Sequence, residues 1–237
     1  MKIAELFYSL QGEGALLGVP SVFIRTSGCN LRCAWCDTPY TSWQPEGVDF
    51  SLDRILDEVN AHPARHVVIT GGEPMIAPEI IALTGRLRQA GLHITVETAG
   101  TVFQPVACDL MSISPKLANS TPLAGRNSRI AGDPQVAGRW AAQHDRLRIN
   151  LEVLRNLMDR YDYQLKFVIE KTADLDELRE LVSALSADPG RVVLMPEGTD
   201  RDLLRERGAW LAEIAKAEGF RFTPRLHVEL WGNRRGV

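Results

Sequence analysis

The sequence predicts an α/β fold, a partial (open) parallel β/α barrel, and three observations lead to it. Short β-branched runs alternate with amphipathic helical patterns, which is typical of βα units and a parallel sheet. Unusual glycine, cysteine and charged residues follow directly after successive strands, and in parallel barrels the loops at that end form the active site. The 237 residues are 45% hydrophobic, which is enough to bury one full core. We therefore expect a single domain over residues 1–237.

Seven segments rich in β-branched and apolar residues are predicted as strands. In chain order they are Ser21–Thr26, His66–Thr70, His93–Thr98, Leu110–Ser114, Gln164–Glu170, Arg191–Met195 and Phe220–His227. Each is short and bounded by turn-forming residues, as strands in globular proteins are. The unusual residues of the chain lie in the segments that directly follow these predicted strands.

Amphipathic patterns between the strands predict helices at Ser51–Asn60, Pro78–Ala90, Ile149–Arg160, Thr172–Leu185 and Asp200–Glu218. The first opens with a serine that can cap its first turn, and its apolar residues recur at helical spacing. The second has a proline near its start and a glycine just past its end, the usual asymmetry of helix termini. A polar segment with several glycines breaks the alternation, and we expect an insertion there, around residues 119–148.

Composition and charge indicate which partners and which cellular compartment to expect. A formal net charge of −3 gives no reason to expect nucleic-acid or membrane binding. No stretch approaches the roughly 18 apolar residues of a membrane span, and Glu5 interrupts an apolar run too short for a signal peptide. Clustered free thiols fit a reducing compartment, so we expect a cytoplasmic protein.

Cys29, Cys33 and Cys36 form a C-x3-C-x2-C cluster. An iron–sulfur cluster fully ligated by cysteine uses four thiolates. Three thiolates can hold three irons of a [4Fe-4S] cluster and leave the fourth iron open to another ligand. The sequence therefore predicts these three cysteines as ligands of such a cluster.

The main alternative is a structural zinc site, which normally has four nitrogen or sulfur ligands. Cys108 is the one remaining cysteine, and it lies in an apolar stretch that reads as a buried strand. His62 and His66 could each supply a fourth ligand, but neither has paired spacing. A disulfide framework is disfavoured, because three of the four cysteines crowd into eight residues.

The cysteine spacing resembles that of the radical S-adenosylmethionine (SAM) enzymes, and Thr70-Gly71-Gly72-Glu73-Pro74 resembles their GGEP motif. In that superfamily SAM chelates the open iron and is cleaved to a 5′-deoxyadenosyl radical that abstracts a substrate hydrogen. The resemblance implies a barrel of the radical SAM type. It also implies SAM contacts from Trp35, Asp37, Gly72, Ser114, Pro115 and Lys116. The loop after a late strand adds weaker candidates, namely Met195, Pro196, Glu197 and Gly198.

Four further segments are similar to 7-carboxy-7-deazaguanine synthases. They are Phe7–Gly14, Gly18–Arg25, Cys36-Asp37-Thr38 and the ending His227–Val237. The similarity spans nearly the whole chain and is weakest across Asn119–Asp159. It implies conversion of 6-carboxy-5,6,7,8-tetrahydropterin to 7-carboxy-7-deazaguanine by hydrogen abstraction, ring contraction and loss of ammonia, towards queuosine and other deazapurines.

The same resemblance assigns roles to residues and partners. It implies that Mg²⁺ is bound through Thr38. Substrate binding is implied for Leu10, Gln11, Gly12, Arg25 and Thr70, with His227 and Val237 as weaker candidates. It further implies a homodimer, and an electron donor such as flavodoxin or ferredoxin must reduce the cluster.

Two other functions stay open at this point. Activases of glycyl-radical enzymes have similar length and the same cysteine spacing, but their N-terminal motif differs from Leu10–Gly14. A non-catalytic zinc-binding interaction protein would bind zinc without iron or sulfide. Neither alternative accounts for both ends of the chain.

Overall fold

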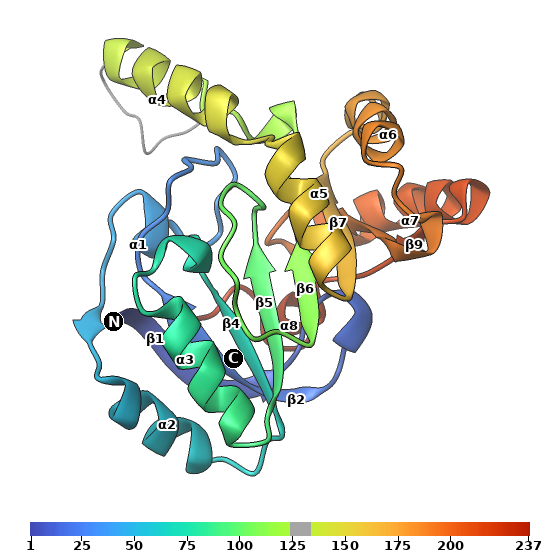
Figure 1. Ribbon diagram of the computed structural model, residues 1–237. Helices are drawn as coiled ribbons and strands as arrows, with labels where there is room; N and C mark the ends of the chain where they lie inside the picture. Colours follow the sequence, from blue (N-terminus) through green and yellow to red (C-terminus); the bar gives the residue numbers. More distant parts are fainter. Residues whose placement is uncertain (124–133) are drawn as a thin grey trace.

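The computed structural model describes residues 1–123 and 134–237, with side chains from residue 138 onward in the second range. The strands within these ranges are β1 (Lys2–Leu10), β2 (Pro20–Thr26), β3 (Val48–Asp49), β4 (His66–Gly71), β5 (His93–Thr98), β6 (Leu110–Ile113), β7 (Tyr163–Ile169), β8 (Val192–Pro196) and β9 (Arg221–Phe222). They form one sheet in the order β3-β1-β2-β4-β5-β6-β7-β8-β9. Strands β2 and β4 to β9 pair in parallel, whereas β1 pairs antiparallel with β2 and β3. The sheet curls but does not close, so the predicted open parallel barrel is confirmed (Figure 1).

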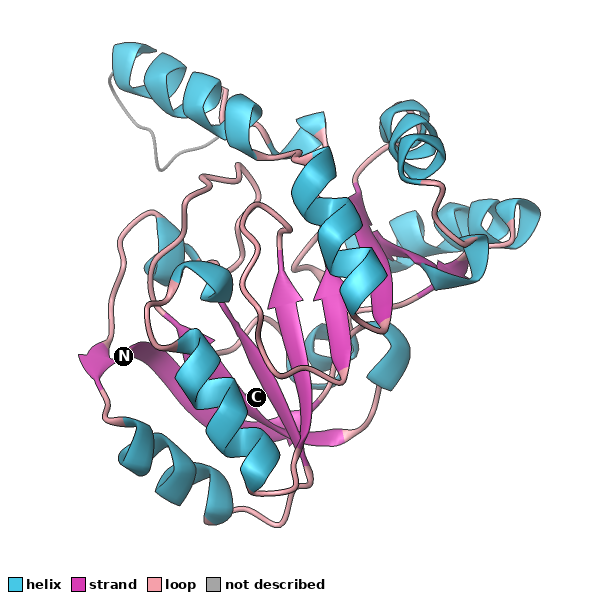
Figure 2. Ribbon diagram, in the orientation of Figure 1, coloured by secondary structure: helices cyan, strands magenta, loops and turns pink. Residues whose placement is uncertain are grey.

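Most of the helices described pack against the outside of the sheet (Figure 2). They are α1 (Pro39–Ser42), α2 (Leu52–Asn60), α3 (Ile80–Gln89), α4 (Pro134–Leu147), α5 (Leu151–Arg160), α6 (Asp174–Leu185), α7 (Arg201–Glu218) and α8 (Leu226–Trp231), with short 3₁₀ turns η1 (Gly14–Leu16), η2 (Pro74–Ile76), η3 (Ala118–Ser120) and η5 (Pro189–Arg191). The expected caps are present: the Ser51 hydroxyl accepts the Arg54 N–H at 3.2 Å, and Gly219 ends α7 with a φ of 72°. None of the helices described is long and apolar enough to span a bilayer.

Alternation along each strand separates the hydrophobic core from the interior of the barrel. Val67 and Ile69 of β4 are fully buried in the core beneath the helices. Thr70 has the opposite parity and lines the interior cavity. The same alternation in β7 buries Phe167 in the core and directs Lys166 inward. The sequence of each strand thus selects which side chains reach the site.

One predicted strand is wrong over most of its length. Strand β9 covers only Arg221–Phe222, and the rest of the predicted Phe220–His227 strand turns into α8. Pro224 lacks a backbone N–H and cannot continue a hydrogen-bonded ladder. The chain instead turns so that Leu226 N–H donates to the Gly12 carbonyl at 2.9 Å.

The structure also adds elements that the sequence patterns did not predict. Residues Lys2–Leu10 form the long strand β1, and helix α4 occupies Pro134–Leu147 within the segment expected to be a polar insertion. Part of that segment, residues 124–133, lies outside the described residues. Cys108 precedes β6 and is not inside a strand, which corrects the expectation of a strand-embedded thiol.

Candidate active site

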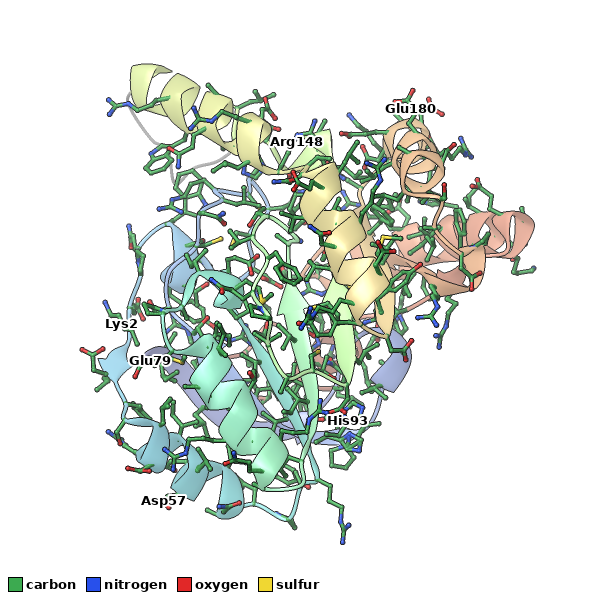
Figure 3. The ribbon with its side chains drawn as sticks, viewed as in Figure 1. Lys2, Asp57, Glu79, His93, Arg148 and Glu180 are labelled. Carbon is green, nitrogen blue, oxygen red and sulfur yellow. The ribbon has the colours of Figure 1, made fainter. Side chains whose placement is uncertain are left out.

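A cavity of about 530 Å³ opens at the carboxyl ends of the parallel strands. Figure 3 helps to locate it: Arg148 lies at the junction of α4 and α5 near this end, and His93 marks the opposite, amino end of β5. The lining includes twenty of the residues predicted from sequence, namely Leu10, Gln11, Gly12, Arg25, Cys29, Cys33, Trp35, Cys36, Asp37, Thr38, Thr70, Gly72, Ser114, Lys116, Met195, Pro196, Glu197, Gly198, His227 and Val237. Pro115 is buried between two of them and does not line the cavity.

The cysteine loop, residues 28–38, rests directly on the glycine turn that follows β4. Gly28 accepts the backbone N–H of Glu73 at 2.9 Å and donates to the Thr41 carbonyl at 2.8 Å. A Cβ added to Gly72 would lie 2.0 Å from the Gly28 carbonyl oxygen. This close approach accounts for glycine at position 72.

Burial leaves the three thiols of this loop poorly suited to ionise alone. Loss of solvation raises the pKa of Cys29 to about 12, with the charge of Glu73 adding to the effect. The pKa of Cys33 and that of Cys36 are also raised, first by burial and then by neighbouring negative groups. Thiolates held in such a place need a compensating cation, and a metal bound there would displace their protons.

The described residues form no site at which several protein side chains of the zinc-binding types converge on one ion. Within residues 1–123 and 134–237 no group of three or more His, Cys, Asp and Glu side chains is arranged to hold one ion. The zinc-site alternative therefore finds no support in the described part of the chain. Three thiols around a larger multi-iron cluster remain the arrangement that the donor set fits.

Glu73 braces the turn beneath the cysteine loop. Its carboxylate accepts the hydroxyl of Thr98 at 2.8 Å and the backbone N–H groups of Ala99 and Met75 at 2.8 and 3.0 Å. The residue is buried, and burial raises the pKa of its carboxyl. These bonds connect the turn after β4 to the end of β5.

Helix α4 covers the outer side of the cysteine loop. His144 Nδ1 accepts the backbone N–H of Arg32 at 3.1 Å, and the Arg32 guanidinium carbon lies 4.5 Å from the centre of the Trp140 ring. Trp140 meets Trp43 edge-on, and Trp43 Nε1 donates to the Cys33 carbonyl at 3.1 Å. The segment expected as an insertion thus supports the cysteine loop, which no sequence motif indicated.

Residues after β6 and in the cysteine loop form one wall. Lys116 Nζ donates to the Ser114 carbonyl and hydroxyl at 2.6 and 2.7 Å and lies 5.8 Å from the centre of the Trp35 ring. Trp35 Nε1 donates to Asn119 Oδ1 at 3.3 Å. An aromatic face, a hydroxyl and a cation therefore lie beside the thiols.

The same cavity is lined by a polar layer from the turn after β1 and from β4 and β5. Gln11 Nε2 donates to one oxygen of Glu97 at 3.1 Å, and the Thr70 hydroxyl donates to the other at 2.8 Å. Glu97 lies within the predicted strand His93–Thr98 and was not among the predicted site residues, and the structure brings it into the site. Its inward parity in β5 was the available signal.

Arg25 lies beside this layer with its guanidinium partly engaged. Its Nε donates to Glu5 Oε2 at 2.8 Å, and the Tyr40 hydroxyl donates to the same oxygen at 2.7 Å. Among the described residues neither Nη group of Arg25 has a hydrogen-bond partner. Those two donors are available for a carboxylate ligand.

A buried charge network closes the far side of the cavity. Glu13 pairs with Lys166 of β7 and with Arg225, whose Nε lies 3.1 Å from Glu13 Oε1. Arg225 also pairs with Asp37 of the cysteine loop. Although burial opposes ionisation, the two cations hold the pKa of Glu13 well below its usual range. Sequence reasoning missed Lys166 and Arg225; a lysine within an apolar strand was a weak signal for the first, and nothing local marked the second.

The C-terminal residues lie beside the same cavity. A Cβ added to Gly12 would lie 2.1 Å from His227 Nδ1, so glycine at position 12 admits the imidazole ring. Burial lowers the pKa of His227. Arg235 stacks on the Tyr40 ring with its guanidinium carbon 3.4 Å from the ring centre. Val237 follows and lines the cavity.

Thr38 lies one turn from the thiols. Its hydroxyl oxygen is 3.9 Å from Cys36 Sγ and accepts the Thr41 hydroxyl at 3.4 Å. This position places a neutral oxygen ligand at the boundary between the cysteine loop and the polar layer. Magnesium commonly takes few such protein ligands, with substrate oxygens and water completing its shell.

Comparisons with known proteins agree with this geometry. Residues 23–118 match the model of the radical SAM superfamily. The chain is 48% identical over 98% of its length to the 7-carboxy-7-deazaguanine synthase of Halobacterium salinarum, 91% of which is covered. It is 43% identical over 99% of its length to the enzyme of that name from Rhodopirellula baltica, 88% of which is covered.

Solved structures add agreement in three dimensions. The crystal structure of QueE from Escherichia coli matches with a TM-score of 0.67 and 28% identity, over 95% of this chain and 94% of that one. The structure of Streptococcus suis SuiB bound to S-adenosylmethionine matches with a TM-score of 0.52 and 13% identity, over 86% of this chain and 50% of that one. The second likeness concerns the fold alone.

Proposed function

The chain belongs to the 7-carboxy-7-deazaguanine synthase family of radical SAM enzymes, and we propose that it converts 6-carboxy-5,6,7,8-tetrahydropterin to 7-carboxy-7-deazaguanine. The single observation that carries the proposal is the shared cavity. Its lining includes three thiols and a polar layer with a partly free guanidinium, which supports a site for both a cluster and a carboxylate substrate. The product would feed queuosine and other 7-deazapurines. The enzyme is a carbon–nitrogen lyase, because ammonia leaves as the ring contracts.

Cys29, Cys33 and Cys36 would hold a [4Fe-4S] cluster, and the wall beside them would bind SAM. Bound together, these groups supply abstraction of a hydrogen atom from the substrate. Trp35 offers a flat apolar face to the adenine, and the Ser114 hydroxyl and Lys116 ammonium suit ribose and carboxylate groups. Asp37, Gly72 and the loop Met195–Gly198 would complete the SAM site, whereas Pro115 does not line the cavity and would act only by holding Ser114 and Lys116 in place.

Substrate would bind across the cavity from SAM. The two Nη groups of Arg25 are placed to bind its carboxylate as paired, charge-assisted donors. Gln11, Thr70 and the backbone of Leu10–Gly12 present donors and acceptors to the pterin edge. Two residues near the C-terminus, His227 and Val237, would line the substrate pocket.

Thr38 would bind Mg²⁺ together with oxygens of the substrate and water. A hydroxyl near the thiols, with no carboxylate ligand of its own, predicts weak metal binding until substrate arrives. Thr38→Ala should lose most of the Mg²⁺ stimulation of product formation while keeping the brown cluster and SAM binding. Undiminished stimulation in this variant would exclude Thr38 as the ligand.

Partners and location follow from the same chemistry. The cluster needs an electron from outside the chain, so we expect a flavodoxin or ferredoxin as donor. A homodimer is expected from the family, and a cytoplasmic location from four cysteines that remain free thiols.

The decisive experiment is anaerobic incubation of the reconstituted enzyme with SAM, dithionite, Mg²⁺ and the carboxypterin, followed by mass spectrometry. A new product with the mass of 7-carboxy-7-deazaguanine supports the proposal. Cleavage of SAM with unchanged carboxypterin would leave the radical SAM chemistry in place and refute the substrate.

A further inference from the structure

Arg225 belongs to no recognised motif, yet its guanidinium joins three loops around the cavity. The side chain is 8% exposed. Its Nε donates to Glu13, its Nη1 donates to the Gly198 carbonyl at 2.6 Å, and its Nη2 donates to Asp37. All three donor positions of the guanidinium are therefore used, each towards a different loop.

Each partner lies next to a residue with a proposed binding role. Glu13 follows Gly12 in the turn assigned to substrate. Asp37 lies between Cys36, a cluster ligand, and Thr38, the magnesium candidate. Gly198 ends the loop after β8 that is assigned to SAM. One rigid, planar side chain thus fixes the spacing between the substrate turn, the cysteine loop and the SAM loop.

The backbone around Arg225 reinforces the connection to the substrate turn. Leu226 N–H donates to the Gly12 carbonyl at 2.9 Å, and the Thr223 hydroxyl accepts the Gly14 N–H at 2.8 Å. The segment Thr223–Leu226 is therefore hydrogen-bonded to the substrate turn at two points. A displacement of that turn by a ligand would be transmitted through Arg225 to the other two loops.

We call the three contacts of Arg225, with Glu13, Asp37 and Gly198, the joint. Because the charges in it are balanced, breaking it would lower the stability of the folded protein. Glu13 and Asp37 supply two carboxylates, and Arg225 and Lys166 supply two cations. Removing one member of a buried ion-paired group leaves an uncompensated charge and is strongly destabilising. The arrangement therefore has one strongly preferred geometry.

We propose that Arg225 is a positioning residue that couples occupation of the substrate turn to productive cleavage of SAM. The proposal rests on the proposed function, because it takes the carboxypterin as the ligand of that turn. With the joint intact, the substrate carbon and the SAM loop are held at the spacing that hydrogen transfer requires. With the joint broken, SAM is still cleaved, but the hydrogen is taken from the substrate less often.

Two variants of Arg225 separate positioning from charge. Arg225→Gln removes the cation, whereas Arg225→Lys keeps it but cannot reach three loops with one planar group. For both we expect the ratio of deazaguanine product to released 5′-deoxyadenosine to fall at least tenfold, measured with dithionite as reductant. A lysine variant with the wild-type ratio would show that charge alone suffices and would overturn the proposal.

Arg207 provides the matched control, because it holds the same SAM loop from the other side. Its Nη1 donates to the Glu197 carbonyl at 2.6 Å, and its hydrogen bonds and ion pairs within the described part of the chain go to Glu197 and Glu170, not to the substrate turn. Arg207→Gln should raise the SAM concentration needed for half-maximal rate and leave the product ratio unchanged. An equal fall of the ratio in Arg207→Gln and Arg225→Gln would reduce Arg225 to a general support of the SAM loop, against the proposal.

A third variant tests the joint if Arg225→Gln does not fold. Should Arg225→Gln not bind the cluster, Asp37→Asn keeps the shape and one hydrogen bond of the joint while removing one charge. Its ratio should also fall, by a smaller factor, and an unchanged ratio would count against the joint. Failure of the proposed function looks different, because the wild-type enzyme would then release 5′-deoxyadenosine and form no deazaguanine product.

Discussion

The two walls of the cavity are built in opposite ways. The cluster side consists of the cysteine loop, residues 28–38, and the Gly71–Pro74 turn, and it is held by backbone hydrogen bonds and close glycine contact. The substrate side consists of Leu10–Gly14, Lys166 and Thr223–His227, and it is held by buried ion pairs between side chains. The thiols of the first wall are buried, whereas the charged side chains of the second wall pair with one another and, through Arg225, with Asp37 of the first wall.

This difference reflects what each wall has to do. Under the proposed function, thiols whose pKa is raised by burial would exchange their protons for a metal cluster, so the cofactor would complete the cluster side. The ion pairs of the substrate side are made within the chain, so we expect this side to be formed before substrate binds. Preorganised charge pairs provide that fixed geometry.

Loss of a cluster ligand tests the first wall and should have the largest effect. Replacing Cys29, Cys33 or Cys36 by Ala should abolish the brown chromophore or SAM cleavage, since a three-thiol site has no spare ligand. Absorption spectra and 5′-deoxyadenosine release measure both properties. Cys108→Ala is the control, because Cys108 lies outside the cavity lining and its thiol donates to the Ile94 carbonyl. Equal loss in Cys108→Ala would contradict the three-cysteine assignment.

The close contact between Gly72 and the Gly28 carbonyl should be nearly as sensitive to substitution as the three cysteines. Gly72→Ala places a methyl group against the Gly28 carbonyl at 2.0 Å, so the backbone of one turn must shift. We expect SAM binding to weaken by at least tenfold, because both turns border its site. Equilibrium binding of SAM to the reconstituted protein measures this. Gly85→Ala in α3, where no atom lies within 4 Å of an added Cβ, is the control. Unaltered SAM affinity in Gly72→Ala would show that the contact can relax.

The site residues that could be predicted from the sequence belong to short, contiguous motifs. The three cysteines, the Gly71–Pro74 turn and the Leu10–Gly12 turn are contiguous motifs, and the parallel strands that carry them follow from alternation in the sequence. Lys166 and Arg225 could not be assigned in this way, because their partner Glu13 is 153 and 212 positions away in the chain. The predicted final strand failed for a related reason: Pro224 ends the ladder, and the segment is held by contacts with Gly12 and Gly14.

Arg25 also lines the cavity but lies outside the buried ion pairs of the second wall, so its contact with substrate can be removed without disrupting those pairs. A charge-assisted hydrogen bond is worth about 1.5–3 kcal/mol, so Arg25→Ala should lower kcat/KM for the carboxypterin by roughly 10- to 150-fold. SAM cleavage in the absence of substrate should change far less, because Arg25 pairs with Glu5 and not with the cluster side. Steady-state product formation and uncoupled 5′-deoxyadenosine release separate the two. Identical substrate kinetics in the variant would remove Arg25 from the site.

The smallest expected effect is a loss of stability at low pH. It depends on His144 of α4, which is hydrogen-bonded to the cysteine loop. Its Nδ1 accepts the Arg32 N–H at 3.1 Å, so Nε2 carries the proton and donates to Ser120 Oγ at 2.8 Å. Burial lowers the pKa of His144 to about 4, with Arg148 and Lys116 acting in the same direction and Asp145 opposing them. Because the folded pKa lies below the unfolded value of roughly 6.5, the stabilisation is complete above that pH. It is lost as the pH falls towards about 4.

The measurement is the melting temperature of the metal-free protein from pH 7.5 to pH 4.5, in wild type and in His144→Gln. Protonation of Nδ1 removes the acceptor for Arg32, so the wild-type advantage should be largest near pH 7 and should shrink on acidification. One lost hydrogen bond of about 1 kcal/mol corresponds to roughly 2–4 °C in a chain of this size. The Glu13 network should keep its charges over the same range, because its cations hold the pKa of Glu13 well below the usual range. A wild-type advantage that stays constant with pH would mean that His144 supports the cysteine loop by packing alone.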